Sequence, residues 1–343
     1  MIDLSSLTFD GLKQVITELG YPVYRAKQIY KWISRGVLDF DCMVDLPKDL
    51  RAFLTQNFTM ATLHVRRRYE DTTDHTVKYV FELNDGYLIE TVVMHYHYGN
   101  SVCISSQAGC RMGCKFCAST LRGKQRDLTA GEMFAQVAFA KADYDITHVV
   151  VMGVGEPLDN YDNLLIFLEN LHHPAGLNIS HRNVSVSTCG LVDKIDLLAD
   201  KKLQITLSVS LHAPNDEIRD KIMPVNKIWN VEQLIASCKQ YIEKTGRRIS
   251  FEYTLIKGVN DTMLHARQLS ALLKGMLAHI NLIPVNYVPE RGMKPSSKSA
   301  VQTFYKKLGS YGLHVTVRRT LGKNINASCG QLRLVEDKNG VVR

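Results

Sequence analysis

The chain has 343 residues, which is enough for one large domain or two, and its hydrophobic fraction of 45% is enough for a folded core. No run of about 18 or more apolar residues occurs, so a membrane-spanning helix is not expected. The net charge of +8 favours a polyanionic partner, because Lys and Arg release counterions when they bind phosphates, with a merely basic enzyme as the alternative.

The start of the chain lacks the basic-then-apolar layout of a secretory signal, so we expect a cytoplasmic protein. Residues 1–58 predict a small helical domain. The stretch YRAKQIYKWISRG has Ile29, Trp32 and Ile33 at helical spacing, with basic residues between them. LPKDLRAFLTQNF predicts a second helix with Pro47 near its start. This basic module is a candidate for binding the polyanion, and a structural cap is the alternative.

A β-hairpin extension is predicted for residues 59–95. Alternating apolar residues lie on both sides of an Asn-Asp-Gly sequence at 84–86, which is typical of a tight hairpin turn. Three arginines at 66–68 add a basic spot beside the hairpin. Such a run is usually a solvated face, but the charge of the whole chain also makes it a candidate for phosphate contacts.

Strand and helix patterns alternate through residues 96–343, which predicts an α/β domain. The candidate strands read VCISS, THVVVMG, NVSVST, QITLSVSLH, RISFEYTLI, HINLIPVN and HVTVRR. Helical patterns between them are typical of a parallel β/α series, so we predict a partial (β/α)6-type barrel. Polar residues follow several strands, at the end that carries the chemistry in such barrels.

The chain has eight cysteines, and in the reducing cytosol they favour metal binding or redox chemistry over structural disulfides. Cys110, Cys114 and Cys117 form a CxxxCxxC motif whose thiolates can converge on one centre. A structural zinc site needs four ligands, whereas three thiolates on a four-iron cluster leave one iron free to bind a substrate. Cys103 lies seven residues upstream and does not fit the spacing. In the zinc alternative, Cys103 or Cys189 would be the fourth ligand.

This motif, with Phe116 just before its last cysteine, resembles that of the radical S-adenosylmethionine (SAM) superfamily. The resemblance implies a [4Fe-4S] cluster on the three cysteines, with SAM chelated by the open iron. Gly155 and Glu156 in the GVGEP sequence look like the segment of the superfamily that holds the SAM amino group. The resemblance suggests further SAM contacts at other strand ends, namely Ser187, Ser210, Leu211, His212 and Asn286.

Several longer stretches narrow the resemblance. YRAKQIYKWI, CISSQAGCRMGCKFCAST, MGVGEPLDNYDN, SVSLHAPNDEIRDKIMPVNK, IPVNYVPERG and ASCGQL are together similar to the RlmN/Cfr family of radical SAM RNA methyltransferases. The resemblance implies methylation of adenine C2 in 23S rRNA (adenosine 2503) and in tRNA (adenosine 37). It also implies an electron donor such as flavodoxin or ferredoxin, and we expect a monomer.

Three alternatives stay open from the sequence. The first is methylation at C8 of the same rRNA adenine, as in the Cfr branch of the family. The second is a radical SAM enzyme that acts on a substrate other than RNA. The third is a zinc-containing nucleic-acid-binding module without catalysis.

The family mechanism assigns roles to residues outside the cysteine motif. Adenine C2 is electron-poor and cannot attack SAM directly. A cysteine matched by Cys329 is methylated by one SAM, and a second SAM supplies the radical that activates this methyl group. Cys103 matches the cysteine that releases the product through a transient disulfide with Cys329, so we expect its thiol to be accessible. Glu90 matches a proposed proton acceptor, with an exposed strand residue as the alternative.

Overall fold

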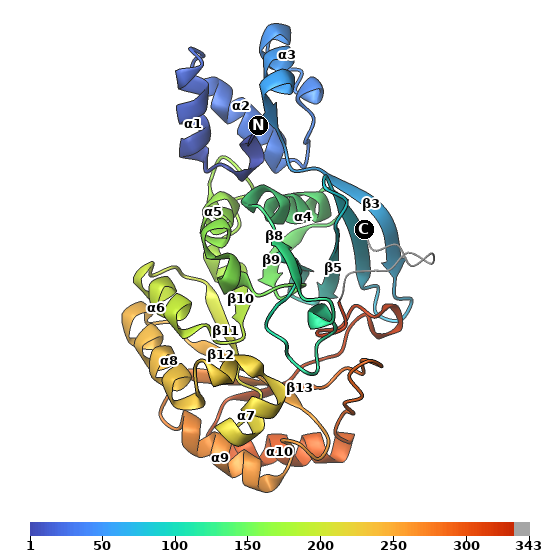
Figure 1. Ribbon diagram of the computed structural model, residues 1–343, viewed down its shortest axis with the longest axis vertical. Helices are drawn as coiled ribbons and strands as arrows, with labels where there is room; N and C mark the ends of the chain where they lie inside the picture. The colour runs from blue at the N-terminus through green and yellow to red at the C-terminus, as the bar shows by residue number, and fades with distance from the viewer. Residues whose placement is uncertain (333–343) are drawn as a thin grey trace.

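A ten-stranded sheet in the order β14-β13-β12-β11-β10-β9-β6-β5-β4-β3 runs through the molecule (Figure 1). The computed structural model describes residues 1–332. Within that range, the seven neighbouring strands of this sheet from β14 to β6 pair in parallel. Their bounds are β6 Gly99–Cys103, β9 Ile146–Val151, β10 Val184–Thr188, β11 Thr206–Ser210, β12 Ile249–Leu255, β13 Ala278–Pro284 and β14 Val315–Val317. The predicted parallel barrel is therefore confirmed.

Helices return the chain between successive parallel strands, as parallel pairing requires. They are α4 Ala130–Asp143, α5 Tyr161–His172, α6 Val192–Asp200, α8 Val231–Thr245, α9 Met263–Leu273 and α10 Lys298–Ser310, with a short extra helix α7 Asp216–Ile222 after β11. The sequence did not single out α6 and α7, which are only 9 and 7 residues long. No helix within residues 1–332 is both long enough and apolar enough to cross a bilayer.

Local sequence determines where these helices begin and end. Thr129 caps α4 and exchanges hydrogen bonds with Glu132 in a capping box. Asn230 and Gln233 form the same motif at the start of α8. That helix ends at Gly246, which has a left-handed conformation (φ 65°) that suits glycine.

The predicted hairpin extension is also present. Strands β3 Leu63–Glu70, β4 Val77–Leu83 and β5 Leu88–Tyr96 form an antiparallel ribbon, and the turn between β4 and β5 lies at 84–86 as predicted. β5 pairs with β6, and Val92 faces Cys103 in this register. The extension therefore continues the barrel sheet without a break.

The N-terminal helices form a separate lobe above α4 and α5 (Figure 1). They are α1 Phe9–Glu18, α2 Tyr24–Ser34 and α3 Lys48–Asn57. A short parallel pair, β1 Ile2–Asp3 and β2 Phe58–Thr59, closes the lobe at its base. The two predicted helices correspond to α2 and α3.

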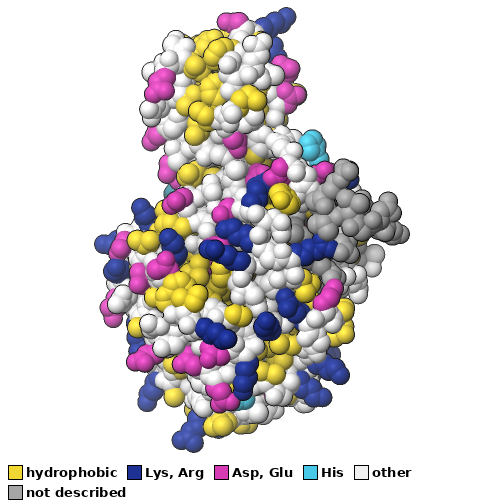
Figure 2. Space-filling view, in the orientation of Figure 1, with side chains coloured by type: hydrophobic (Ala, Val, Ile, Leu, Met, Phe, Trp, Pro, Cys, Tyr) yellow, Lys and Arg dark blue, Asp and Glu magenta, His cyan; other side chains and the backbone are white. Residues whose placement is uncertain are grey.

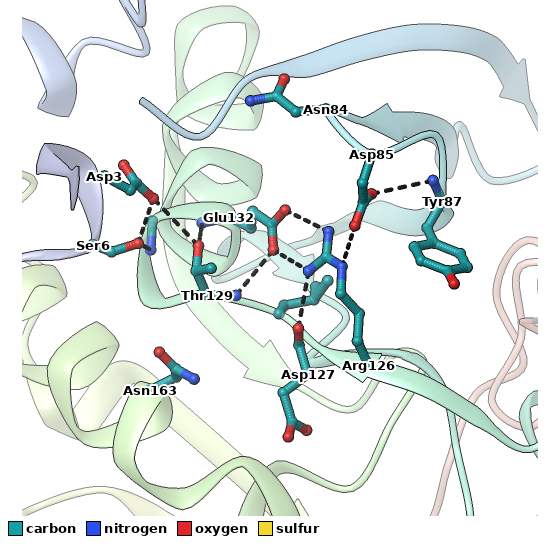
Figure 3. Close-up of polar contacts among 12 residues, drawn as sticks. Asp3, Ser6, Asn84, Asp85, Tyr87, Arg126, Asp127, Thr129, Glu132 and Asn163 are labelled. Atoms are coloured by element: carbon teal, nitrogen blue, oxygen red, sulfur yellow. Dashed lines mark hydrogen bonds and ion pairs between the residues drawn. The ribbon is translucent and has the colours of Figure 1, made fainter. Parts of the chain in front are cut away.

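Polar contacts fix this lobe and the hairpin to the start of α4 (Figure 3). The Ser6 hydroxyl donates to Asp3 Oδ2 (2.5 Å) and accepts from the Gly131 N–H (3.0 Å). Arg126 donates to both carboxylate oxygens of Glu132 (2.7 and 2.8 Å) and also bonds Asp85 in the hairpin turn. A guanidinium that donates to two carboxylates at once fixes the geometry between them. The N-terminal lobe, the hairpin and the start of α4 are therefore held in one arrangement.

Candidate active site

A cavity lies at the carboxyl ends of the parallel strands and gathers most of the predicted site residues. It is lined by the cysteine motif, the loop after β9, the ends of β10 and β11, and a C-terminal loop. The predicted residues on its wall are Cys110, Cys114, Cys117, Gly155, Glu156, Ser187, Ser210, His212, Asn286 and Cys329. Leu211 differs, because its side chain is fully buried in the hydrophobic core and is absent from the cavity wall.

The cysteine loop is held by a small antiparallel hairpin that the sequence analysis missed. It consists of β7 Gln107–Gly109 and β8 Lys124–Asp127, which flank the motif. A Cβ on Gly109 would lie 2.0 Å from the Gly123 carbonyl oxygen, so only glycine fits there. The glycines on both sides of the motif were the signal for this hairpin.

The three motif thiols are largely withdrawn from water. Burial raises the pKa of Cys110 to about 12, and burial also raises the pKa values of Cys114 and Cys117. Within residues 1–332, no group of three or more His, Cys, Asp or Glu side chains is arranged to bind a single metal ion. A buried thiolate is stable only beside positive charge, and three thiolates without a fourth protein ligand suit a cluster with one open iron.

The glycine-rich loop after β9 packs closely and orients a buried carboxylate. A Cβ on Gly155 would lie 2.7 Å from Ser106 Oγ, and the φ of this glycine is +116°. Glu156 is 4% exposed, and its two oxygens accept from the main-chain N–H groups of Leu158 (3.1 Å) and Cys189 (2.7 Å). Burial raises the pKa of Glu156. These bonds fix the carboxylate on the cavity wall, where it can accept from a ligand ammonium group.

His212 is a neutral hydrogen-bonding group in this cavity. Its Nδ1 accepts from the Thr254 N–H (3.0 Å), which leaves the proton on Nε2. Burial, followed by the nearby Arg219 charge, lowers the pKa of His212 to about 3. Its ring meets Phe116 of the cysteine motif edge to face, with centroids 4.9 Å apart. The imidazole therefore joins the end of β11 to the cysteine loop.

Arg219 organises these strand ends, and sequence analysis missed it. Its side chain is fully buried and donates to the carbonyls of Cys189 (2.6 Å), Ser210 (3.1 Å) and Leu211 (3.1 Å). No local pattern marks it, because the burial depends on packing between β10, β11 and α7. The Leu211 main chain thus supports the site while its side chain fills the core.

A second cavity shares Cys329 with the first and adds the remaining predicted cysteine, Cys103. Cys103 and Cys329 line it together with Asn286 and Arg318. The Asn286 side-chain amide donates to the Cys329 carbonyl oxygen (2.9 Å). The first barrel strand and the C-terminal loop therefore meet, as expected, and both cysteines are free thiols in this structure.

The structure corrects two sequence-based expectations at Cys103. The candidate strand VCISS, in which Cys103 is the second residue, is displaced, because β6 begins at Gly99 and ends at Cys103. Its thiol is not accessible from solvent, since Cys103 is only 5% exposed, and burial raises its pKa to about 12. A reacting group can reach this sulfur only through the cavity.

Arg318 places a cation beside the two thiols, and sequence analysis did not single it out. It lines both cavities. The negative charge of a Cys329 thiolate raises the pKa of Arg318 most, and Glu252 and Cys103 act in the same direction. At Cys103 the Arg318 charge acts to lower the thiol pKa, against the larger effect of burial, so this guanidinium favours a thiolate there.

Glu90 is buried, so the alternative of an exposed strand residue was wrong. Its carboxylate is 2% exposed and pairs with Lys78 Nζ at 2.8 Å. Lys78 also donates to the Asn326 carbonyl oxygen (3.3 Å) in the C-terminal loop. Glu90 is not on the wall of either cavity described above, and it is linked to the Cys329 loop through Lys78.

Two family models match the chain. The radical SAM superfamily model covers residues 104–269, and the model for the N-terminal domain of ribosomal RNA large subunit methyltransferases covers residues 2–60. The first match includes the cysteine motif and four strands of the barrel. The second match covers the helical lobe.

Similar proteins span nearly the whole chain. A probable dual-specificity RNA methyltransferase RlmN from a Thermoanaerobacter species is 49% identical over 97% of this chain and 98% of its own length. A protein of the same description from Lachnospira eligens is 51% identical over 97% of this chain and 96% of its own length. The crystal structure of a radical SAM methyltransferase from Sphaerobacter thermophilus matches with a TM-score of 0.93 at 42% identity, covering 97% of this chain and 99% of that chain.

Proposed function

Because the chain belongs to the RlmN family of radical SAM RNA methyltransferases, we propose that it methylates C2 of adenosine in 23S rRNA and tRNA. The observation that carries the proposal is the pair Cys103 and Cys329 on one cavity wall, next to the cavity of the cysteine motif. A radical SAM enzyme for another substrate class, or a zinc module, would need no such pair. The relatives named above are described as dual-specificity RNA methyltransferases, which supports both RNA substrates.

The first cavity would hold the cofactors of the family. Cys110, Cys114 and Cys117 would bind a [4Fe-4S] cluster, and Glu156 would accept from the SAM ammonium group. When bound and reduced, the cluster and SAM supply a radical that can remove hydrogen from an unactivated carbon. The remaining predicted contacts to SAM are Gly155, Ser187, Ser210, His212, Asn286 and the Leu211 main chain.

Cys329 and Cys103 would carry the methyl transfer. The Cys329 thiolate takes a methyl group from a first SAM, and removal of hydrogen from this methyl leaves a carbon that bonds to C2. The adduct loses the C2 proton and one electron, for which the oxidised cluster would be the acceptor, and this restores the aromatic ring. The Cys103 thiolate then attacks the Cys329 sulfur and the S–C bond breaks. The electron pair stays on carbon, which gains a proton and becomes the methyl group. The two cysteines end as a disulfide, which cellular thiols reduce by exchange.

Arg318 and Glu90 would assist from fixed positions. Arg318 stabilises the thiolate of whichever cysteine is attacking. Its own charge is maintained by Cys329, Glu252 and Cys103, which raise its pKa against the opposing effect of burial. Glu90 is proposed as the acceptor of the C2 proton. That role requires the Glu90 carboxylate to exchange its Lys78 partner during the reaction, since the pair is intact here.

RNA would be held by basic groups outside the cavities. Figure 2 shows Lys and Arg side chains gathered over the middle of one face of the barrel. Arg66 and Arg68 are about half exposed and pair with Glu82 and Glu70, so phosphates would compete with these carboxylates. The helical lobe, residues 1–58, is the second candidate for RNA contacts. A small acidic electron carrier such as flavodoxin or ferredoxin would reduce a monomeric enzyme.

Mass spectrometry of total RNA tests the substrate and the position together. Cells that lack the gene should lose 2-methyladenosine from 23S rRNA and tRNA, and the intact gene should restore it. The Cys329→Ala gene should not restore it, whereas Cys42→Ala, an exposed cysteine in the helical lobe, should. Appearance of 8-methyladenosine in place of 2-methyladenosine would contradict the proposal and would show that the enzyme methylates C8.

A further inference from the structure

The loop that carries Cys329, residues 321–332, is held by a turn at the far end of the hairpin extension. This turn, residues 71–76, joins β3 to β4 and is called the docking turn below. Figure 1 shows the red C-terminal segment beside the end of the blue ribbon that carries β3. The two segments are far apart in the sequence and meet because β5 pairs with β6 in one continuous sheet.

Carboxylates of the docking turn accept main-chain N–H groups of the loop. Asp71 Oδ2 accepts from the Asn324 N–H (3.0 Å), and Asp71 Oδ1 accepts from the Asn324 side-chain amide (3.0 Å). Asp74 Oδ2 accepts from the Gly322 N–H (2.9 Å). Hydrogen bonds to ionised acceptors are about twice as strong as neutral ones.

The docking turn also has hydrogen bonds of its own, within residues 71–76. Asp71 is 1% exposed and also accepts from the Thr73 N–H (2.9 Å), while Asp74 accepts from the Thr76 N–H (3.0 Å). Hydrogen bonds from Thr73, followed by those from Asn324, lower the pKa of Asp71 to about 2. The Asp71 carboxylate is therefore ionised at physiological pH, and its hydrogen bonds fix it toward the loop.

The loop approaches the turn closely at a glycine. Gly322 has a φ of +63°, and a Cβ there would lie 2.9 Å from Thr76 Cγ2 and 2.7 Å from Ala327 Cβ. Lys78, which follows the docking turn, adds the bond to the Asn326 carbonyl oxygen (3.3 Å). The contact thus combines close packing at Gly322 with hydrogen bonds between neutral loop groups and charged side chains of the hairpin.

The other end of the loop is fixed by the cysteine-motif segment. The Ala118 N–H donates to the Gly330 carbonyl (2.7 Å), and the Ser119 hydroxyl donates to the Leu332 carbonyl (2.6 Å). Cys329 lies between these contacts and those of the docking turn. The orientation of its sulfur relative to Cys103 therefore depends on both anchors.

We propose that the docking turn is a clamp, with Asp71 as a positioning residue that holds Cys329 in line with Cys103. The inference rests on the proposed roles of the two cysteines. Attack of one sulfur on another needs alignment along the bond that breaks, and a short loop anchored at one end would sample many orientations. The clamp acts on residues 322–326, through main-chain groups and through the Asn324 side-chain amide.

Thiol oxidation and hydrogen exchange test the clamp on the cofactor-free full-length protein. Diamide oxidises Cys103 and Cys329 to a disulfide and is itself reduced to the hydrazine, so neither SAM nor RNA is needed. In Asp71→Ala, exchange of the loop amides should rise roughly 10- to 100-fold, the range expected for loss of a hydrogen bond to a charged group. The rate of disulfide formation should fall by roughly tenfold or more.

A second variant approaches the same contact from the loop side. Gly322→Ala pushes the loop from Thr76 without altering the turn and should give both effects. Asp39→Ala, which removes an acceptor in the helical lobe, is the control and should change neither rate. Unchanged disulfide formation in both test variants would overturn the proposal, and so would exchange that rises equally throughout β3 and β4. If the wild-type protein does not methylate RNA, the proposed function is contradicted. The oxidation and exchange rates can still be compared between the variants, because neither measurement needs SAM or RNA.

Discussion

At the scale of single residues, the proposed chemistry depends on ionisable side chains whose pKa values are shifted by burial. The CxxxCxxC motif could be predicted because its spacing is local, and the strand-end residues His212 and Glu156 could be predicted from the family resemblance. Arg219 and Arg318 could not, since their environment comes from strands that pack together only in the folded chain. The environment of Glu90 could not be predicted either, because its position in a strand does not show that it is buried and paired with Lys78.

The His212 pKa gives a prediction for stability against pH. The folded state holds this group neutral, with a pKa of about 3 compared with 6.5 for the free side chain. Its contribution to folding is therefore complete above about pH 6.5 and is lost as the pH falls toward 3. Urea unfolding of the cofactor-free protein should show wild type losing a few kcal/mol more than His212→Gln between pH 7 and pH 4.5. The exposed-residue variant His64→Gln should follow wild type, and parallel curves for wild type and His212→Gln would contradict the prediction.

At the scale of elements, periodic patterns predicted the long helices and the parallel strands, and an Asn-Asp-Gly turn predicted the hairpin. The missed elements are short. α6 and α7 offer only two or three turns of pattern, and β7 and β8 pair for a few residues across the cysteine loop. Their positions depend on close main-chain contacts, such as that of Gly109 with Gly123. In the sequence, the only sign of such a contact is the glycine itself.

The β7–β8 hairpin should be needed to shape the cysteine loop. Gly109→Ala would place a Cβ 2.0 Å from the Gly123 carbonyl oxygen at a φ of +79°, so we expect a loss of roughly 2–4 kcal/mol in unfolding free energy. Gly86→Ala has nothing within 4 Å of the new Cβ and should lose only about 1 kcal/mol. The loss of stability is measured from urea unfolding midpoints. The effect on the cysteine loop is measured as bound iron per chain after anaerobic reconstitution. Equal stability and equal iron in the two variants would refute the role of the hairpin.

At the scale of the whole molecule, one sheet connects the hairpin extension with the barrel. The antiparallel extension continues the barrel sheet through β5 and β6, and its far turn receives the loop of Cys329. Pattern and composition predict the barrel and the extension separately. They cannot predict that the two sulfurs share a cavity, because that depends on strand register and loop docking over most of the chain. Only the family resemblance connected Cys103 with Cys329 before the fold was known.

The most direct test of the two-cysteine mechanism is to trap its covalent intermediate. Cys103→Ala protein, reconstituted anaerobically and given SAM, a reductant and an RNA substrate, should accumulate RNA linked to Cys329, visible as a shifted band and as a peptide–nucleotide mass. Cys42→Ala should turn over without such a band, and the double variant Cys103→Ala/Cys329→Ala should give neither band nor product. Clean turnover by Cys103→Ala, or a crosslink at another residue, would contradict the proposed mechanism.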